Sequence, residues 1–311
     1  MFADIDNKMI FLISPPNSGS TLLQQMLMNS DEVVSFPESW LMLYPLYQFK
    51  PSTYLKSNFR FDLAKTHVLR FLNEIDKDKI DLIKDLAKIY SQYYAKKRNN
   101  NNQYVLDKTP RYYLIIEELQ IAFPNAKFIF LIRNPLNTFA STVSRYEKEL
   151  DDKFLYLKSD FILALEEIKK FLKKADQNSI LIRYEDLCNT TNKTIKILCE
   201  FLTIPYDDSL TIYKFKEAYS TDKWGDKSGN IAANNKAFLV KNNLDFKYLK
   251  SKNVFFSTLQ YCRFIDKDTM EFFGYDKNDN LSILKKHKYY RRRFFFNPNK
   301  SYFRKIIGSV I

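Results

Sequence analysis

Glycine, cysteine and histidine are scarce in this chain of 311 residues, and each scarcity narrows what the protein can be. Because only five glycines are present, a glycine is expected where the backbone needs a left-handed turn or a close approach. The three cysteines are odd in number and widely spaced, which argues against a disulfide framework and a metal site. No apolar run approaches the roughly 20 residues that span a bilayer, and no signal-peptide pattern is seen, so we expect a cytoplasmic protein.

Positive charge is concentrated at one end of the chain. The formal net charge is +13, but residues 280–311 hold nine basic residues and no acidic one, which leaves 40 basic and 36 acidic residues elsewhere. We predict a domain at 1–279 and a basic aromatic tail at 280–311. Cations among aromatic residues suit an anionic membrane surface, so residues 285–305 are a candidate contact at the inner face of a membrane. A helix packed on the body is the alternative for the tail, and the near-neutral body disfavours nucleic acid as a partner.

Short apolar runs alternate with helical patterns over much of the chain. Continuous apolar segments, typical of buried parallel strands, lie at 9–13, 33–35, 104–106, 127–132 and 180–184. Apolar residues recur at helical spacing in 21–29, 61–97, 112–122, 137–149, 161–175 and 193–202. The alternation predicts an α/β fold in three layers, with a central parallel sheet flanked by helices.

The loop between the first strand and the first helix is a candidate phosphate site. It holds a glycine among polar residues, namely Asn17, Ser18, Gly19, Ser20 and Thr21. Free backbone N–H groups and the helix dipole favour an anion at such a place. A nucleotide-triphosphatase loop needs a second glycine and a lysine, which counts against a kinase. A hydroxyl-rich helix cap is the structural alternative.

A second polar segment follows the strand at 127–132. Arg133 stands at the end of this strand, and Ser141 follows eight residues later in the predicted helix. An arginine at the carboxyl end of a parallel strand faces the crevice in which α/β proteins bind ligands. The two residues could therefore share an anion, and a surface salt bridge is the alternative for Arg133.

Together these two segments resemble the nucleotide-binding elements of sulfotransferases that use 3′-phosphoadenosine 5′-phosphosulfate (PAPS). The resemblance covers about residues 9–205 and includes Tyr184-Glu-Asp-Leu187 after a strand. It implies a P-loop-like fold, PAPS as co-substrate without a metal, and 3′-phosphoadenosine 5′-phosphate (PAP) as product. It also implies that the loop holds the 5′-phosphosulfate, while Arg133 and Ser141 hold the 3′-phosphate. Since the chain looks closer to the carbohydrate and tyrosylprotein branches, a hydroxyl of a glycan or glycolipid is the favoured acceptor, with peptidyl tyrosine as another.

The resemblance also indicates catalytic residues. Glu38, after the second strand, matches the place of the family's general base, although a carboxylate favoured by a helix dipole is the alternative. Asn17 stands where the family usually has arginine or lysine. Lys108, in Asp107-Lys-Thr-Pro110, is the expected substitute for that cation, with a solvated loop lysine as the alternative. Asn17 also leaves open the alternative that this chain is a catalytically weak relative that binds nucleotide or polyanion.

Three later residues resemble a family loop only loosely. Lys223, Trp224 and Lys227 lie in a segment, 223–230, that holds two of the five glycines. The lysines are candidates for the 3′-phosphate, and Trp224 for stacking on adenine or for a core position. Tyr184 is a candidate for lining the adenine pocket, with the core as alternative. Arg111 is a candidate for an acidic group of the acceptor, and a surface role is equally open.

Overall fold

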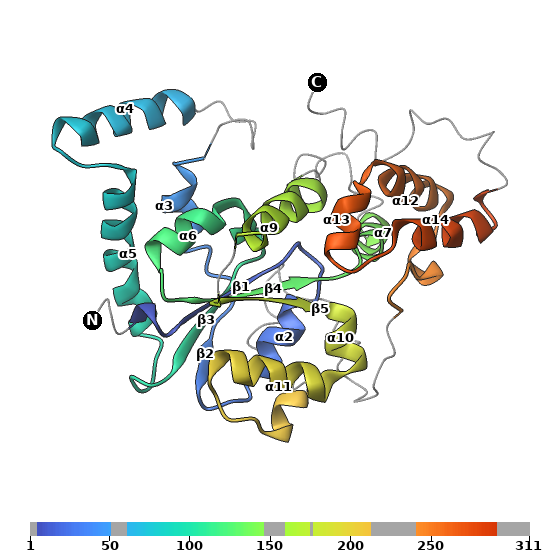
Figure 1. The fold of residues 1–311 in the computed structure, drawn as a ribbon, viewed down its shortest axis with the longest axis horizontal. Coiled ribbons are helices and arrows are strands. Elements are labelled where there is room, and N and C mark those ends of the chain that lie inside the picture. The colour runs from blue at the N-terminus through green and yellow to red at the C-terminus, as the bar shows by residue number, and fades with distance from the viewer. Residues whose placement is uncertain (1–4, 51–60, 146–158, 175–176, 213–240, 291–311) are drawn as a thin grey trace.

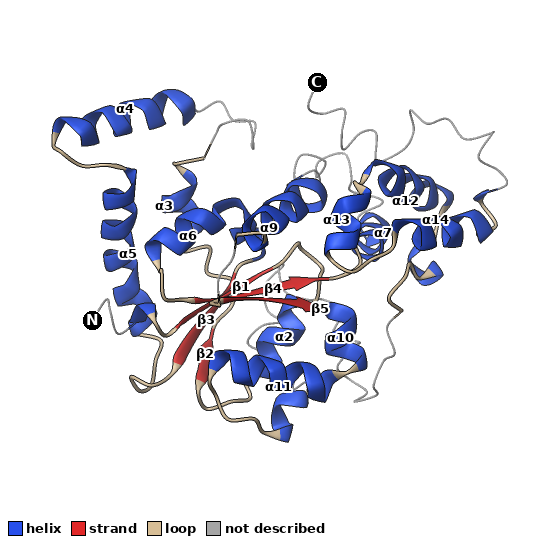
Figure 2. Cartoon of the chain, viewed as in Figure 1, coloured by secondary structure: helices blue, strands red, loops and turns tan. Residues whose placement is uncertain are grey.

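A parallel sheet of five strands forms the middle layer of the protein. The structure, a computed structural model, describes residues 5–50, 61–145, 159–174, 177–212 and 241–290. The strand order is β2-β3-β1-β4-β5, and every neighbouring pair is parallel. The strands are β1 (Met9–Ile13), β2 (Val33–Ser35), β3 (Tyr104–Lys108), β4 (Lys127–Ile132) and β5 (Ser179–Arg183). The prediction of a central parallel sheet between helices is confirmed (Figure 2).

Both faces of the sheet are buried, because alternate residues of each central strand enter separate apolar clusters. In β1, Met9, Phe11 and Ile13 belong to one cluster, while Ile10 and Leu12 belong to the other. All five are fully buried. This two-sided burial explains why the strand reads as a continuous apolar run and not as an alternation of apolar and polar residues.

The first face is covered by the larger set of helices. These are α3 (Leu43–Tyr47), α5 (Lys79–Ala95), α6 (Ile116–Ala122), α7 (Pro135–Arg145), α9 (Ala164–Leu172) and α12 (Lys252–Phe264). The predicted helix at 61–97 is two helices, since α4 (Phe61–Glu74) ends before Asp76, which has a φ of +54°. Asp78 then begins α5 through a capping box with Asp81. Figure 1 shows α4 beyond the end of α5, away from the sheet.

The second face is covered by α2 (Ser20–Leu27), α10 (Tyr184–Asn189) and α11 (Thr191–Leu202). The chain after β1 therefore turns to one face, while the chain after β3 and after β4 turns to the other (Figure 1). In open α/β sheets, such a change of direction opens a crevice at the carboxyl ends of the strands. The loops after β1, β2, β3 and β4 all begin at this edge of the sheet.

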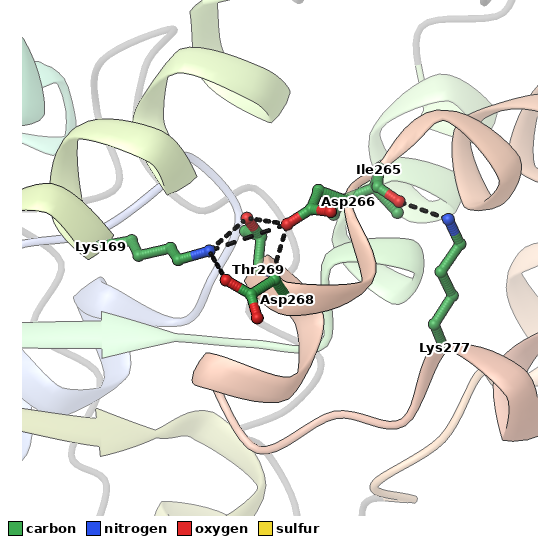
Figure 3. A network of polar contacts seen from close by, with 6 residues as sticks. All are labelled: Lys169, Ile265, Asp266, Asp268, Thr269 and Lys277. Carbon is green, nitrogen blue, oxygen red and sulfur yellow. Dashed lines mark hydrogen bonds and ion pairs between the residues drawn. The ribbon is translucent and has the colours of Figure 1, made fainter.

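The C-terminal helices α13 (Lys267–Phe272) and α14 (Lys277–Lys286) pack in the first apolar cluster through Met270 and Leu284, and two lysines add polar contacts (Figure 3). The Nζ atom of Lys169, on α9, lies 3.2 Å from Asp268 Oδ2 and 3.1 Å from Thr269 Oγ1. Lys277 Nζ donates to the carbonyl oxygen of Ile265, 2.6 Å away, at the end of α12. A cation at a helix C-terminus is favoured by the helix dipole. α14 runs across the predicted boundary at 279/280, which stays a prediction.

Candidate active site

The loop between β1 and α2 turns sharply at Gly19. This residue precedes the first residue of α2 and has a φ of +94°, a conformation that only glycine adopts readily. A Cβ atom there would lie 2.4 Å from Cδ2 and Cε2 of Tyr184, so the position also lacks space for a side chain. The hydroxyls of Ser14 and Ser18 are buried and have no hydrogen-bond partner among the described residues. The loop therefore presents a helix N-terminus and unpartnered hydroxyls.

Arg133 leaves the end of β4 and lies beside this loop. Its guanidinium carbon is 4.8 Å from the ring centre of Tyr184 and 5.2 Å from that of Tyr248, and its Nη2 donates to the Tyr248 hydroxyl. Its Nη1 donates to the carbonyl oxygen of Asn17 at 3.5 Å, while its Nε is buried without a partner. No ion pair with a carboxylate holds Arg133 within the described part of the chain. The salt-bridge alternative is therefore not what the structure shows.

Helix α7 also contacts the loop, through Thr142 and Arg145. Asn17 Nδ2 donates to Thr142 Oγ1 at 2.9 Å, and Arg145 Nη1 donates to Asn17 Oδ1 at 3.3 Å. Ser141 is half-buried on the same helix. Asn17 has a φ of +63°, a left-handed conformation that asparagine tolerates better than most residues.

The turn that carries Arg133 is organised by the buried carboxylate of Glu185. This group accepts a hydrogen bond from the backbone N–H of Asn134 at 3.0 Å and another from the Tyr275 hydroxyl at 2.6 Å. Asn134 in turn caps α7, since its Oδ1 accepts from the N–H of Leu136 at 2.9 Å. An asparagine directly before a proline is a helix-start signal, and α7 begins at Pro135, two residues before the helix predicted at 137–149.

Glu38 and Lys108 meet at the ends of the adjacent strands β2 and β3. Lys108 Nζ lies 2.7 Å from Glu38 Oε1. The lysine side chain is 5% exposed and the glutamate side chain 23%, so the carboxylate keeps access to a substrate. The two predicted catalytic residues are thus brought together as an ion pair, and Lys108 is not a solvated loop residue.

Asp107 supports this pair from the interior. Its buried carboxylate accepts hydrogen bonds from Ser39 Oγ at 2.8 Å, Tyr94 at 2.6 Å, Tyr112 at 2.8 Å and Thr109 at 3.1 Å. Burial raises the pKa of the Asp107 carboxyl, and these hydrogen bonds oppose the rise. Because Ser39 follows Glu38 and Lys108 follows Asp107, the network ties the two catalytic segments together.

A model of the sulfotransferase family matches residues 9–208, the part of the chain that holds these strands and loops. The chain belongs to the sulfotransferase family. Nodulation protein NoeE of Sinorhizobium fredii (strain NBRC 101917 / NGR234) is 34% identical over 137 residues, which cover 44% of this chain and 31% of NoeE. The sulfotransferase domain of the Synechococcus PCC 7002 olefin synthase is similar in fold, with a TM-score of 0.53 and 20% identity over 78% of this chain and 87% of that one.

Some predicted features of this sulfotransferase-family protein lie outside the residues that the structure describes. They are the residues Lys223, Trp224 and Lys227 and the tail beyond residue 290.

Other predictions fall within the described residues. Arg111 does not present a free guanidinium, because Nε and Nη2 donate to Asp160 at 3.2 Å and 3.1 Å. The described part contains no cluster of metal ligands and no helix long and apolar enough to cross a membrane. Tyr184 begins α10 and does not end β5.

Replacing Gly19 with alanine should impair both folding and the loop. We expect Gly19→Ala to lower the free energy of unfolding by about 1–3 kcal/mol, since the left-handed backbone is strained and the Tyr184 ring must move. Urea unfolding and calorimetric binding of PAP measure the two effects. Gly274→Ala is the matched control, because Gly274 is also left-handed, with a φ of +78°, but its nearest contact would be 3.4 Å away. Equal losses of PAP affinity in both variants would contradict this account.

Glu185 should make stability depend on pH. Burial raises the pKa of its carboxyl, against opposing hydrogen bonds from Tyr275 and the Asn134 backbone. The folded protein then holds this proton more tightly than the unfolded chain, so the contribution of Glu185 to stability is largest at low pH and declines as pH rises through the raised pKa. The free energy of unfolding of the wild type minus that of Glu185→Gln should therefore decrease as the pH rises above about 4.5, the ordinary pKa of a glutamate, by at most about 1.4 kcal/mol per pH unit. A constant or increasing difference in urea titrations would refute it.

Proposed function

We propose that this chain transfers a sulfonate from PAPS to a hydroxyl of an acceptor, with a glycan or glycolipid favoured over peptidyl tyrosine. The observation that carries the proposal is the convergence of three features at one edge of the sheet. These are the loop that contains Gly19, the Arg133 guanidinium beside the rings of Tyr184 and Tyr248, and the ion pair of Glu38 with Lys108. Sulfonate transfer needs an anion site, fixed positive charge and a base, and the three features supply them in that order.

The residues present fit the nucleotide that the family implies. Ser18 Oγ and Arg133 Nε are buried polar atoms without partners, and a buried polar group without a partner is unfavourable. Their place beside the N-terminus of α2 suits an anion. We assign the 5′-phosphosulfate to the loop Asn17–Thr21, and the 3′-phosphate to Arg133 and Ser141. PAPS supplies the sulfonate bonded to a phosphate leaving group, which departs as PAP.

Glu38 is assigned as the base that takes the proton of the acceptor hydroxyl. Its partly exposed carboxylate lies at the open edge of the sheet, and Lys108 Nζ holds one of its two oxygens. The other oxygen remains for the acceptor. Lys108 is assigned to balance the negative charge that develops on the transferred group and the leaving phosphate. Asp107 acts through Ser39 to hold the Glu38 segment in place.

The surroundings of Glu38 support a carbohydrate acceptor. Trp40, two residues further on, is 39% exposed, and the Arg111 guanidinium lies 5.8 Å from its ring centre. Its φ of +54° is uncommon for a bulky residue, and its backbone N–H donates to Thr109 Oγ1 at 3.3 Å. A rigid aromatic face beside the base offers a surface on which a sugar ring can pack.

The basic tail is a candidate contact with a membrane. Its described part exposes Lys285, Lys286 and Lys288, which supports contact with an anionic membrane surface, whereas His287 is packed on Phe255.

The role of Glu38 can be tested with Glu38→Gln. We expect this variant to lose sulfonate transfer by about a hundredfold or more, since an amide cannot accept the proton, while its affinity for PAP persists. The measurement is mass spectrometry for an added sulfonate on glycans, glycolipids and tyrosyl peptides incubated with PAPS. Glu32→Gln, at the opposite end of β2, is the matched control. Full activity of Glu38→Gln would show that Glu38 is not the base. PAP binding without any transfer by the wild type would favour a non-catalytic relative, and ATP turnover a kinase.

Arg133 should determine nucleotide affinity. Replacing it with alanine removes a charged donor that is already held beside the loop, so the dissociation constant for PAP should increase about tenfold or more. Isothermal titration calorimetry measures the constant. Arg70→Ala, which removes an exposed arginine of α4, is the control with the same change of charge. An unchanged dissociation constant in Arg133→Ala would overturn the assignment.

A further inference from the structure

The loop that is assigned to the 5′-phosphosulfate contains no cation of its own. Its residues, Asn17–Thr21, include neither lysine nor arginine, and neither do residues 14–16 before them. Backbone N–H groups and a helix dipole favour an anion, but the dipole is equivalent to only about half a charge. A doubly charged phosphosulfate, with more charge developing on the leaving phosphate, calls for positive charge from elsewhere in the fold.

Lys108 does not meet this need fully, because it is already paired. Its Nζ lies 2.7 Å from Glu38 Oε1, so the pair carries no net charge before the donor arrives. Within the described residues, Arg133 hydrogen-bonds the loop through the carbonyl oxygen of Asn17, and its guanidinium lies against the rings of Tyr184 and Tyr248. Among the described residues, this leaves Arg145 as a second guanidinium at the loop.

Arg145 reaches the loop through the side chain of Asn17. The Asn17 amide is held at both ends by α7: Nδ2 donates to Thr142 Oγ1 at 2.9 Å, and Oδ1 accepts from Arg145 Nη1 at 3.3 Å. Thr142 and Arg145 are three residues apart and so share one face of the helix. No carboxylate within the described ranges pairs with Arg145. A guanidinium has five N–H donors, and the contact with Asn17 occupies one of them.

We propose that Arg145, held in place by Asn17, supplies the positive charge of the loop and binds the 5′-phosphosulfate end of the nucleotide. The asparagine and the arginine together then do what one basic side chain in the loop would do. This inference rests on the proposed function, because it requires that the loop bind the 5′ end of PAPS. It assigns Arg145 to the 5′ group and not to the 3′-phosphate, which stays with Arg133 and Ser141.

The decisive variant is Arg145→Gln. Glutamine can still donate a hydrogen bond to Asn17 Oδ1 but carries no charge, so it separates the charge from the contact. We expect the dissociation constant for PAP to increase about five- to thirtyfold, in line with the loss of a charge-assisted hydrogen bond. Affinity for adenosine 5′-phosphate should fall in proportion, whereas affinity for adenosine 3′-phosphate should stay within about twofold. Arg133→Ala should instead lower the affinity for adenosine 3′-phosphate. Arg70→Gln on α4 is the control for net charge.

A second variant tests whether charge is the cause. Placing a lysine in the loop, as Asn17→Lys in the Arg145→Gln background, should restore PAP affinity to within about threefold of the wild type. The steepness with which PAP affinity falls with salt should decrease in Arg145→Gln and recover in the double variant. Unchanged PAP affinity in Arg145→Gln, selective loss of the 3′-phosphate ligand, or no rescue by the lysine would each overturn the inference. Absence of PAP binding by the wild type would instead refute the proposed function.

Discussion

One buried carboxylate, that of Glu185, holds together the edge of the sheet on which the site is built. It links the first turn after β5 to the turn after β4, through the N–H of Asn134, and to the C-terminal helices, through Tyr275. Asn134 extends the connection, because its Nδ2 donates to the side chain of Asn280 at 3.2 Å and its Oδ1 caps α7. Since α7 holds Asn17, the shape of the phosphate loop depends on a hydrogen-bond network centred on Glu185, whose own bonds go to Asn134 and Tyr275.

Local patterns predicted the layers of the fold and missed features that depend on long-range packing. The strands at 9–13 and 127–132 were predicted with their correct ends, because both are buried on two faces and bounded by polar residues. The helix predicted at 61–97 is broken between Asp76 and Asp78, where the capping box was a local signal that could have been used. Tyr184 was predicted to end a strand, but it is the first residue of α10 and lies against Gly19 and Arg133.

The site could be predicted in its parts and not in its connections. Motif position indicated Gly19, Arg133, Glu38 and Lys108, since each stands at or shortly after the end of a strand, at the same edge of the sheet. The pairing of Glu38 with Lys108 depends on β2 lying next to β3. The apolar pattern of a strand does not indicate which other strand lies beside it, so this pairing could not be predicted from it. Asp107 was named only as part of a motif, because a carboxylate inside an apolar strand gives no sign that four hydroxyls surround it. Lys223, Trp224 and Lys227 remain predictions.

The position of Arg133 between two tyrosine rings has a consequence for the entropy of binding. A free arginine side chain samples many rotamers, and an anion that binds it must order them all, which costs about 1 kcal/mol or more of conformational free energy. In this protein the rings of Tyr184 and Tyr248 and the Tyr248 hydroxyl have already selected one orientation during folding. The guanidinium therefore binds its ligand in an orientation that is already fixed. Tyr184, which helps to fix it, is itself packed in the second apolar cluster.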